Sequence, residues 1–232
     1  MTAELVDALA ARIKSRIGAV TMSGLVARAD LNGHRATIVG PLDGGRLPVR
    51  IAASGEGVCV RVSSAHGGCD ELPVCLEVGA GSGALSHRLV QRLAGWARVM
   101  ATDSGHDKIP TAGSFCVERL DVDVAIEKFK PAVVLVSWHP SGLDWIRAMR
   151  ASASVQEYIL LGEADSSTCG DGWATWGVLP PRFDEYGLDE KSVAPFSDDG
   201  FVRTSIGQIT KWQACRFDSA AVIMMMMMMM MM

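Results

Sequence analysis

From residue 73 onward, short apolar runs alternate with segments of helical periodicity, and this alternation constrains the fold more than any other feature. The apolar runs are PVCLEVGA (73–80), ARVMAT (97–102), SFCVERL (114–120), PAVVLVSW (131–138) and QEYILLG (156–162). A helix is expected at 142–152, and another is expected to bury a face formed by Leu85, Leu89, Val90 and Leu93. Apolar strands that alternate with helices form a parallel sheet with helices on both faces. We therefore predict an α/β domain over residues 73–218.

The end of the chain carries a run of nine methionines, Met224 to Met232. Before this run, FVRTSI (201–206) and WQACRF (212–217) alternate apolar and polar residues across a short connection, which predicts an antiparallel pair that closes the sheet. A nine-residue apolar stretch is too short to cross a bilayer. We interpret residues 219–232 as a tail that says nothing about the fold.

An amphipathic helix is predicted at residues 2–17, inside an N-terminal segment 1–18 that ends at Gly18. Its apolar stripe recurs every four residues, at Leu5, Leu9, Ile13 and Ile17. We expect this helix to pack on its own domain, with a membrane or targeting helix as the alternative. No secretory apolar region follows the first residues, and Glu4 and Asp7 disfavour an organelle transit peptide without excluding one. A cytoplasmic protein without a membrane span is therefore expected.

Residues 19–64 have a different pattern, in which short β-branched runs are separated by the turn clusters NGH, DGG and SGEG. The spacing of about ten residues predicts a small antiparallel barrel or meander, followed by a linker at 65–72. The stretch GLVARADLNGHRATIVGPLDGGRLPVRI (24–51) resembles the small SH3-like barrels of eukaryotic multidomain proteins. The resemblance implies either a brace between domains or a site for a protein partner.

The charge and the cysteines exclude several classes of function. The formal net charge is -4, and residues 19–64, the most basic block, carry only five bases against three acids. A large nucleic-acid footprint is therefore unexpected. The six cysteines contain no CxxC pair, so we expect no metal site and interpret them as reduced thiols.

A glycine-rich turn, Glu77-Val78-Gly79-Ala80-Gly81-Ser82-Gly83, connects the first apolar strand of the α/β domain to a helix. Glycines let the backbone turn sharply and let a ligand approach closely. The spacing is GxGxG, which disfavours a nicotinamide oxidoreductase, whose fingerprint is GxGxxG. Asp103 follows the next strand, 20 residues after Gly83, where a carboxylate can accept two ribose hydroxyls.

This set of residues resembles the first motif and the ribose-binding acid of class I, Rossmann-like S-adenosylmethionine-dependent methyltransferases. The resemblance implies a Rossmann-like sheet over 73–218 and S-adenosylmethionine as the cofactor. It also implies that Asp103 binds the ribose and that Asp121, with Val122 beside it, faces the adenine amino group. The other cofactor-binding residues that it implies are Glu77, Gly79, Ala80, Gly81, Gly83 and Ser137. Asp103 as a turn residue and Asp121 as a helix N-cap are the alternatives.

The tetrapeptide Ser137-Trp138-His139-Pro140 ends the fourth strand, where this family keeps its reaction-centre motif. It departs from the N/D-P-P-Y/F form of enzymes that methylate planar amides and amines, so that mechanism does not transfer. His139 is the candidate general base, because its unperturbed pKa is near 6.5, and Trp138 is the second candidate catalytic residue. A loop histidine and a tryptophan packed at the sheet end are the alternatives.

The methyl acceptor is expected to meet Trp145, Glu163 and Trp176. Packing at the sheet end is the alternative for Trp145, and a solvated loop acid is the alternative for Glu163. Residues 163–199 carry nine acids and two bases, so a cationic or aromatic acceptor, a protein side chain or a small molecule, is favoured over nucleic acid. We therefore predict a methyltransferase whose acceptor the sequence leaves open. The alternative is a catalytically inactive methyltransferase-like scaffold or interaction subunit of a larger assembly.

Overall fold

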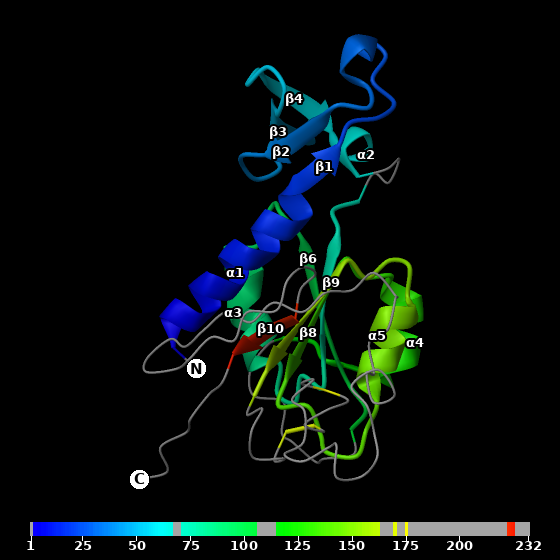
Figure 1. The fold of residues 1–232 in the computed structure, drawn as a ribbon. Coiled ribbons are helices and arrows are strands. Elements are labelled where there is room, and N and C mark those ends of the chain that lie inside the picture. Colours follow the sequence, from blue (N-terminus) through cyan, green and yellow to red (C-terminus); the bar gives the residue numbers. More distant parts are fainter. Residues whose placement is uncertain are drawn as a thin grey trace, which may run out of the picture. The chain divides into compact units, whose positions relative to one another are not determined.

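The computed structural model describes residues 2–66, 71–105, 115–162, 169–170, 175 and 222–225 (Figure 1). Its contacts divide the chain into two compact units. The first unit contains Met1–Cys75 and Ala84–Met100, and the second contains Leu76–Gly83 and Ala101–Met232. The division passes inside strands β5 (Val74–Val78) and β6 (Arg98–Asp103), and not at the expected linker.

The first unit opens with helix α1 (Ala3–Gly18), close to the helix predicted from the sequence. Thr2 caps it by accepting a hydrogen bond from the Leu5 amide at 3.4 Å. The predicted stripe is buried, and α1 packs against helix α3 (Ala84–Arg92) of the same unit. Asp7 of α1 pairs with Arg92 at 3.1 Å.

The rest of the first unit is an antiparallel sheet in the order β1-β2-β3-β4. Its strands are β1 (Ala19–Thr21), β2 (Arg35–Ile38), β3 (Arg46–Ile51) and β4 (Gly57–Arg61). A short 3-10 helix η1 (Ala29–Leu31) lies between β1 and β2. The sheet is open, because β1 has only three residues and β4 runs directly into helix α2 (Val62–Ala65) where a further strand would be needed for closure.

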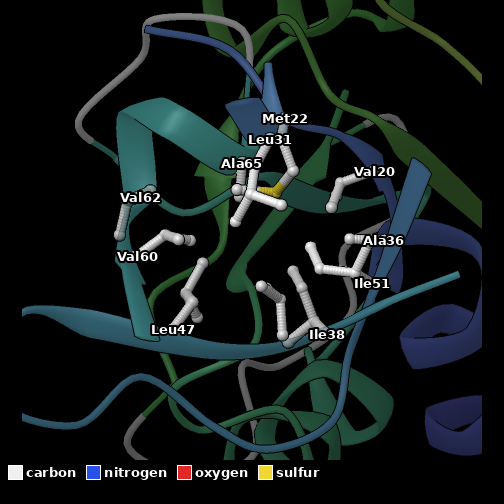
Figure 2. Packing of buried hydrophobic residues seen from close by; sticks show 11 residues of the cluster. Val20, Met22, Leu31, Ala36, Ile38, Leu47, Ile51, Val60, Val62 and Ala65 are labelled. Atoms are coloured by element: carbon white, nitrogen blue, oxygen red, sulfur yellow. The ribbon is translucent and has the colours of Figure 1, made fainter. Parts of the chain in front are cut away.

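One face of this sheet is buried against η1 and α2, as Figure 2 shows. Every second residue of β2 and β3 points inward, so the strands alternate as the sequence predicted. Complete burial of an aliphatic side chain stabilises a fold by about 1.5–3 kcal/mol, so this cluster contributes to the stability of the sheet. Its members are Val20, Met22, Leu31, Ala36, Ile38, Leu47, Val49, Ile51, Val60, Val62 and Ala65.

The second sheet has the strand order β10-β9-β8-β5-β6-β7. Besides β5 and β6, its strands are β7 (Glu118–Arg119), β8 (Val133–Ser137), β9 (Glu157–Leu161) and β10 (Val222–Met225). The pairs β6–β7, β8–β9 and β9–β10 are parallel. Strands β5 and β9 are buried along their whole length, which explains why their residues are apolar apart from Glu77 and Glu157. The predicted α/β class is confirmed, and the sheet is compatible with a Rossmann-like fold.

Helices α4 (Val122–Phe129) and α5 (Trp145–Ala151) pack against each other beside this sheet (Figure 1). Helix α5 begins three residues later than predicted, because Gly142 has a φ of 78° and Asp144 caps the helix through the Arg147 amide at 3.2 Å. In α3, Leu85 and Leu89 are buried, whereas Val90 is 40% exposed. Placing Val90 on the buried face was therefore wrong, since it lies about 100° around the helix from Leu89.

The interpretation of residues 219–232 as a tail without a place in the fold is corrected by β10. This strand includes the first two methionines of the run and pairs with β9 from Val222↔Tyr158 to Met225↔Leu161. An extended segment can join a strand through backbone hydrogen bonds alone, so its side-chain pattern does not predict that it forms a strand. The expected strands at 201–206 and 212–217 lie outside the described residues. No described helix is long and apolar enough to cross a membrane.

Candidate cofactor site

The glycine-rich turn after β5 depends on backbone conformations that disfavour other residues. Gly79, Gly81 and Gly83 have φ values of 64°, 53° and 73°. A side chain in this left-handed region costs roughly 1–2 kcal/mol per residue. The turn is held at one end by a hydrogen bond from the Gly83 amide to the Ala80 carbonyl at 2.9 Å. At its start, the Ala80 amide donates to the Thr102 carbonyl of β6 at 3.0 Å.

The carboxylate of Asp103 joins the glycine turn to the end of β6. Its Oδ2 accepts from the Gly81 amide at 2.9 Å, and its Oδ1 accepts from the Gly105 amide at 2.8 Å. The second bond is a turn of the kind expected when Asp103 is a turn residue. Each bond has a charged acceptor and is therefore stronger than a neutral hydrogen bond. Asp103 thus organises the turn whether or not a ligand is present.

These two bonds leave Asp103 able to accept further donors. An ionised carboxylate offers about four acceptor positions, and the backbone amides use two of them. Two vicinal hydroxyls would supply two donors, as many as the remaining positions can accept. The arrangement is therefore compatible both with the predicted ribose contact and with the turn-residue alternative.

Two of the three glycines have a second reason for being glycine, which is close packing against protein side chains. A Cβ at Gly79 would lie 2.9 Å from the indole Cη2 of Trp145. A Cβ at Gly83 would lie 2.7 Å from Cγ2 of Val117 and 3.3 Å from Cδ1 of Phe115. Loss of function on substitution at Gly79 or Gly83 would therefore report on packing as well as on a ligand.

The other cofactor-binding residues predicted around this turn differ in exposure. Glu77 is 2% exposed within β5, whereas Asp121 is exposed at the N-cap position of α4. The Asp121 side chain makes no capping hydrogen bond, so its carboxylate is not needed to start the helix. Val122 is buried as the first residue of α4, and Ser137 is the half-buried last residue of β8.

His139, the predicted general base, is buried and is 1% exposed. Its Nδ1 lies 2.8 Å from the Pro140 carbonyl oxygen, which can only accept, so Nδ1 carries the proton of the neutral ring. Its Nε2 is then an acceptor, and it has no hydrogen-bond partner among the described residues. Burial lowers the pKa of His139 more than the bond to Pro140 raises it, so the ring is neutral at pH 7.

The indole of Trp145 packs between this histidine and the glycine turn. Its ring centroid lies 5.0 Å from that of His139, with the planes inclined at 55°. The same indole meets the position where a Cβ of Gly79 would be. Trp145 therefore links the ends of β5 and β8, which favours the packing alternative over a free acceptor-binding surface.

Trp138, the residue before His139, is 38% exposed. Its φ is 60°, and its amide donates to the Leu161 carbonyl at 2.7 Å. A bulky residue in this conformation costs of order 1–3 kcal/mol, and such strain occurs often at functional sites. The turn sends Trp138 and His139 to different environments, so the two predicted catalytic side chains do not share one surface.

The structure brings Gly81 together with Asp103, and Gly79 together with Trp145 and His139. The predicted acceptor residues Glu163 and Trp176 lie outside the described residues. The sequence analysis missed Gly105 as the second donor to Asp103, although the D-S-G sequence is a recognisable turn signal. It also missed the residues that pack against Gly83, namely Phe115 and Val117. No short motif marks such packing contacts.

No model of a protein family matches the chain. The curated proteins contain no match to it either. A function for this chain is therefore inferred from the geometry of the site.

Proposed function

We propose that this chain binds S-adenosylmethionine at the glycine turn and Asp103 and is a class I methyltransferase. The observation that carries the proposal is the 2.9 Å hydrogen bond from the Gly81 amide to Asp103 Oδ2. It supports a ligand site in which the glycine turn and a carboxylate with spare acceptor positions lie side by side at the ends of β5 and β6. Ligands of open parallel sheets bind at this edge, outside the carboxyl ends of the strands.

The residues present fit such a cofactor. Asp103 would accept the ribose hydroxyls, and Gly81, with its φ of 53°, would let the cofactor approach the backbone. Asp121 is exposed one residue before α4 and would accept from the adenine amino group. Glu77 and Ser137 would line the same strand ends. S-adenosylmethionine, when bound, supplies an electrophilic methyl group that is already activated for displacement.

The protein's part in that reaction would be to align an acceptor and to exclude water. Alignment alone can supply roughly 7–11 kcal/mol of the barrier reduction. His139 is neutral, so its Nε2 would take a proton from an acceptor that is protonated at the working pH. Because His139 is 1% exposed, it would do so only for a group that enters its buried surroundings.

The acceptor proposed here is a protein side chain or a small molecule, in preference to nucleic acid. The acidic composition of residues 163–199 supports a cationic or aromatic group. The open sheet of the first unit is proposed to be a reduced form of the SH3-like barrel that its sequence resembles.

A second function is supported by the burial of His139. A methyltransferase-like scaffold would bind the cofactor without turning it over, and a base that is 1% exposed is compatible with this. The two functions differ in one observable, which is release of S-adenosylhomocysteine.

Calorimetric titration with S-adenosylmethionine, S-adenosylhomocysteine and NAD tests the proposal. We expect S-adenosylmethionine and S-adenosylhomocysteine to bind and NAD not to bind. Asp103→Asn should weaken binding, and Asp123→Asn, which changes an exposed acid of α4, is the matched control. Binding of NAD alone would overturn the proposal. Binding with no S-adenosylhomocysteine release in the presence of amine and protein acceptors would favour the scaffold.

A further inference from the structure

A groove of about 460 Å³ lies in the first unit, between strand β4 and the segment 24–28. Apolar side chains and three arginines line it, and no acidic residue does. We propose that this groove binds an extended, acidic segment of a partner protein, which adds to β4 as a further strand. The site is independent of the proposed cofactor site, because all of its residues belong to the first unit.

The backbone of β4 is open to such a strand. β4 is the last strand of the order β1-β2-β3-β4, and no other described strand pairs with its outer side. Cys59 lies opposite Pro48, which has no N–H, so these two residues cannot form a hydrogen-bonded pair. The Pro48 carbonyl instead accepts from the Val39 amide at 2.9 Å, on the side of β2.

It follows that the amide and carbonyl of Cys59 point away from β3, toward the groove. The Arg46 guanidinium reaches the Cys59 carbonyl at 3.3 Å, as expected for an outward-facing acceptor. Because directions alternate along an antiparallel strand, Gly57 and Arg61 present their backbone groups on the same side. A partner strand would find donors and acceptors at every second residue.

The three arginines of the groove differ in whether acidic side chains pair with them. Arg28 pairs with Asp30 at 2.9 Å and with Glu56 at 2.7 Å, so two carboxylates more than neutralise its charge. Arg46 and Arg61 lie opposite each other in the β3–β4 register and are exposed. Neither forms an ion pair with an acid of the described residues. These two guanidiniums at the rim favour a partner segment with carboxylate side chains, which they can bind through paired hydrogen bonds.

The apolar part of the groove favours a peptide over a nucleic acid as the ligand. Val26 is 94% exposed, and Leu25 and Val58 are half-buried beside it. Side chains of an added strand alternate, so one row would meet the arginines and the other would meet these apolar residues. No aromatic side chain lines the groove, and single-stranded nucleic acids depend on such rings for base stacking.

The experiment uses the full chain and fluorescence anisotropy with a labelled peptide of alternating valine and glutamate. The joint change Arg46→Glu and Arg61→Glu should weaken binding at least about tenfold, because it removes both charged donors. Arg35→Glu with Arg50→Glu is the matched control. It makes the same change of charge on the same exposed sheet face, outside the groove, and should leave affinity unchanged.

A second pair of variants tests strand addition itself. Cys59→Pro removes the outward N–H, and an edge strand tolerates proline at such a position. We expect a folded protein, checked by circular dichroism, with peptide affinity lowered about tenfold, whereas Cys59→Ser keeps the N–H and the affinity.

Three results would overturn the proposal. Absence of peptide binding at millimolar concentration would remove the site, and normal affinity in folded Cys59→Pro would exclude strand addition. The third result is that a single-stranded oligonucleotide binds more tightly than the peptide and that both pairs of arginine substitutions weaken its binding equally. This result would identify the sheet face as a nucleic-acid surface.

Discussion

The carboxylate of Asp103 accepts a hydrogen bond from the Gly81 amide at 2.9 Å, so the acid predicted to bind a ribose already holds the glycine turn in place. Its other oxygen accepts from Gly105 at 2.8 Å. From the sequence, Asp103 was expected to bind the ribose, with a role as a turn residue as the alternative. Because it makes both of these bonds, Asp103 should affect both ligand binding and the stability of the fold.

Asp103→Ala should lower the free energy of unfolding of the ligand-free protein by about 1–3 kcal/mol. Two charge-assisted hydrogen bonds are lost, of which the bond from Gly81 is part-buried and the bond from Gly105 is exposed, so the effect stays below the sum for two buried bonds. Urea unfolding measures the change. Asp121→Ala is the control, because the Asp121 side chain caps nothing, and it should change stability by less than about 0.5 kcal/mol. Equal stability of the Asp103 variant and wild type would show that the two bonds contribute nothing.

S-adenosylhomocysteine should raise the melting temperature, and NAD should not. At about 100 times its dissociation constant, a ligand of the native state adds roughly 2.7 kcal/mol of stability. Differential scanning calorimetry with each ligand at millimolar concentration measures the shift. No shift with S-adenosylhomocysteine would refute the cofactor assignment, whatever the methyl acceptor is.

Gly79→Ala should destabilise the protein because of Trp145. The new Cβ would lie 2.9 Å from Cη2 of the indole, and the residue would keep a φ of 64°. The two effects can be separated, because Trp145→Leu removes the clash and leaves the backbone strain. We expect Gly79→Ala to cost about 1 kcal/mol less in the Trp145→Leu background than in wild type. If the free-energy costs of Gly79→Ala and Trp145→Leu were additive, the indole would move aside for the new Cβ without a measurable cost.

Stability should fall as the pH decreases below about 6.5, in part because of His139. Burial lowers the pKa of His139 in the folded state from its ordinary value of 6.5, so the unfolded chain binds the proton more tightly. The contribution is therefore complete above pH 6.5 and is lost as the pH falls toward the folded-state pKa. Each unit of depression corresponds to about 1.4 kcal/mol.

Urea unfolding of wild type and His139→Gln at pH 7.5 and pH 5 measures this term. The variant should lose less stability on acidification than wild type does. Burial also lowers the pKa of His66 in the first unit, so His66→Gln should reduce the same loss independently. An identical pH dependence in all three proteins would show that neither histidine is buried in its neutral form.

Removing residues 226–232 should leave stability unchanged, and removing 222–232 should lower it. The longer deletion takes away β10 and exposes the side of β9 that pairs with it. Thermal unfolding of both truncations makes the comparison. Equal stability of the two would show that β10 contributes little to the sheet.

The sequence determined most of the element order of this protein. Its continuous apolar runs predicted β5, β8 and β9, because a strand buried on both faces needs no polar side. The alternating runs predicted the antiparallel β2, β3 and β4. The glycines of the turn were also readable, since a positive φ leaves few other choices of residue. These features depend on local backbone sterics and on periodicity, which the sequence carries directly.

Only the tertiary structure decided how the side chains at the strand ends are used. Asp103 meets Gly81, Trp145 packs on Gly79, and His139 is buried while Trp138 is exposed, each through contacts between residues distant in sequence or through a turn that no motif marks.

The tertiary structure also decided how the charges of residues 19–64 are distributed. A net excess of two bases says little as a number, but in the folded protein Arg28 pairs with Asp30 and Glu56. Arg46 on β3 and Arg61 on the edge strand β4 form no ion pair with an acid of the described residues. Coulomb and packing energies depend on distance in space, and the sequence does not contain that distance.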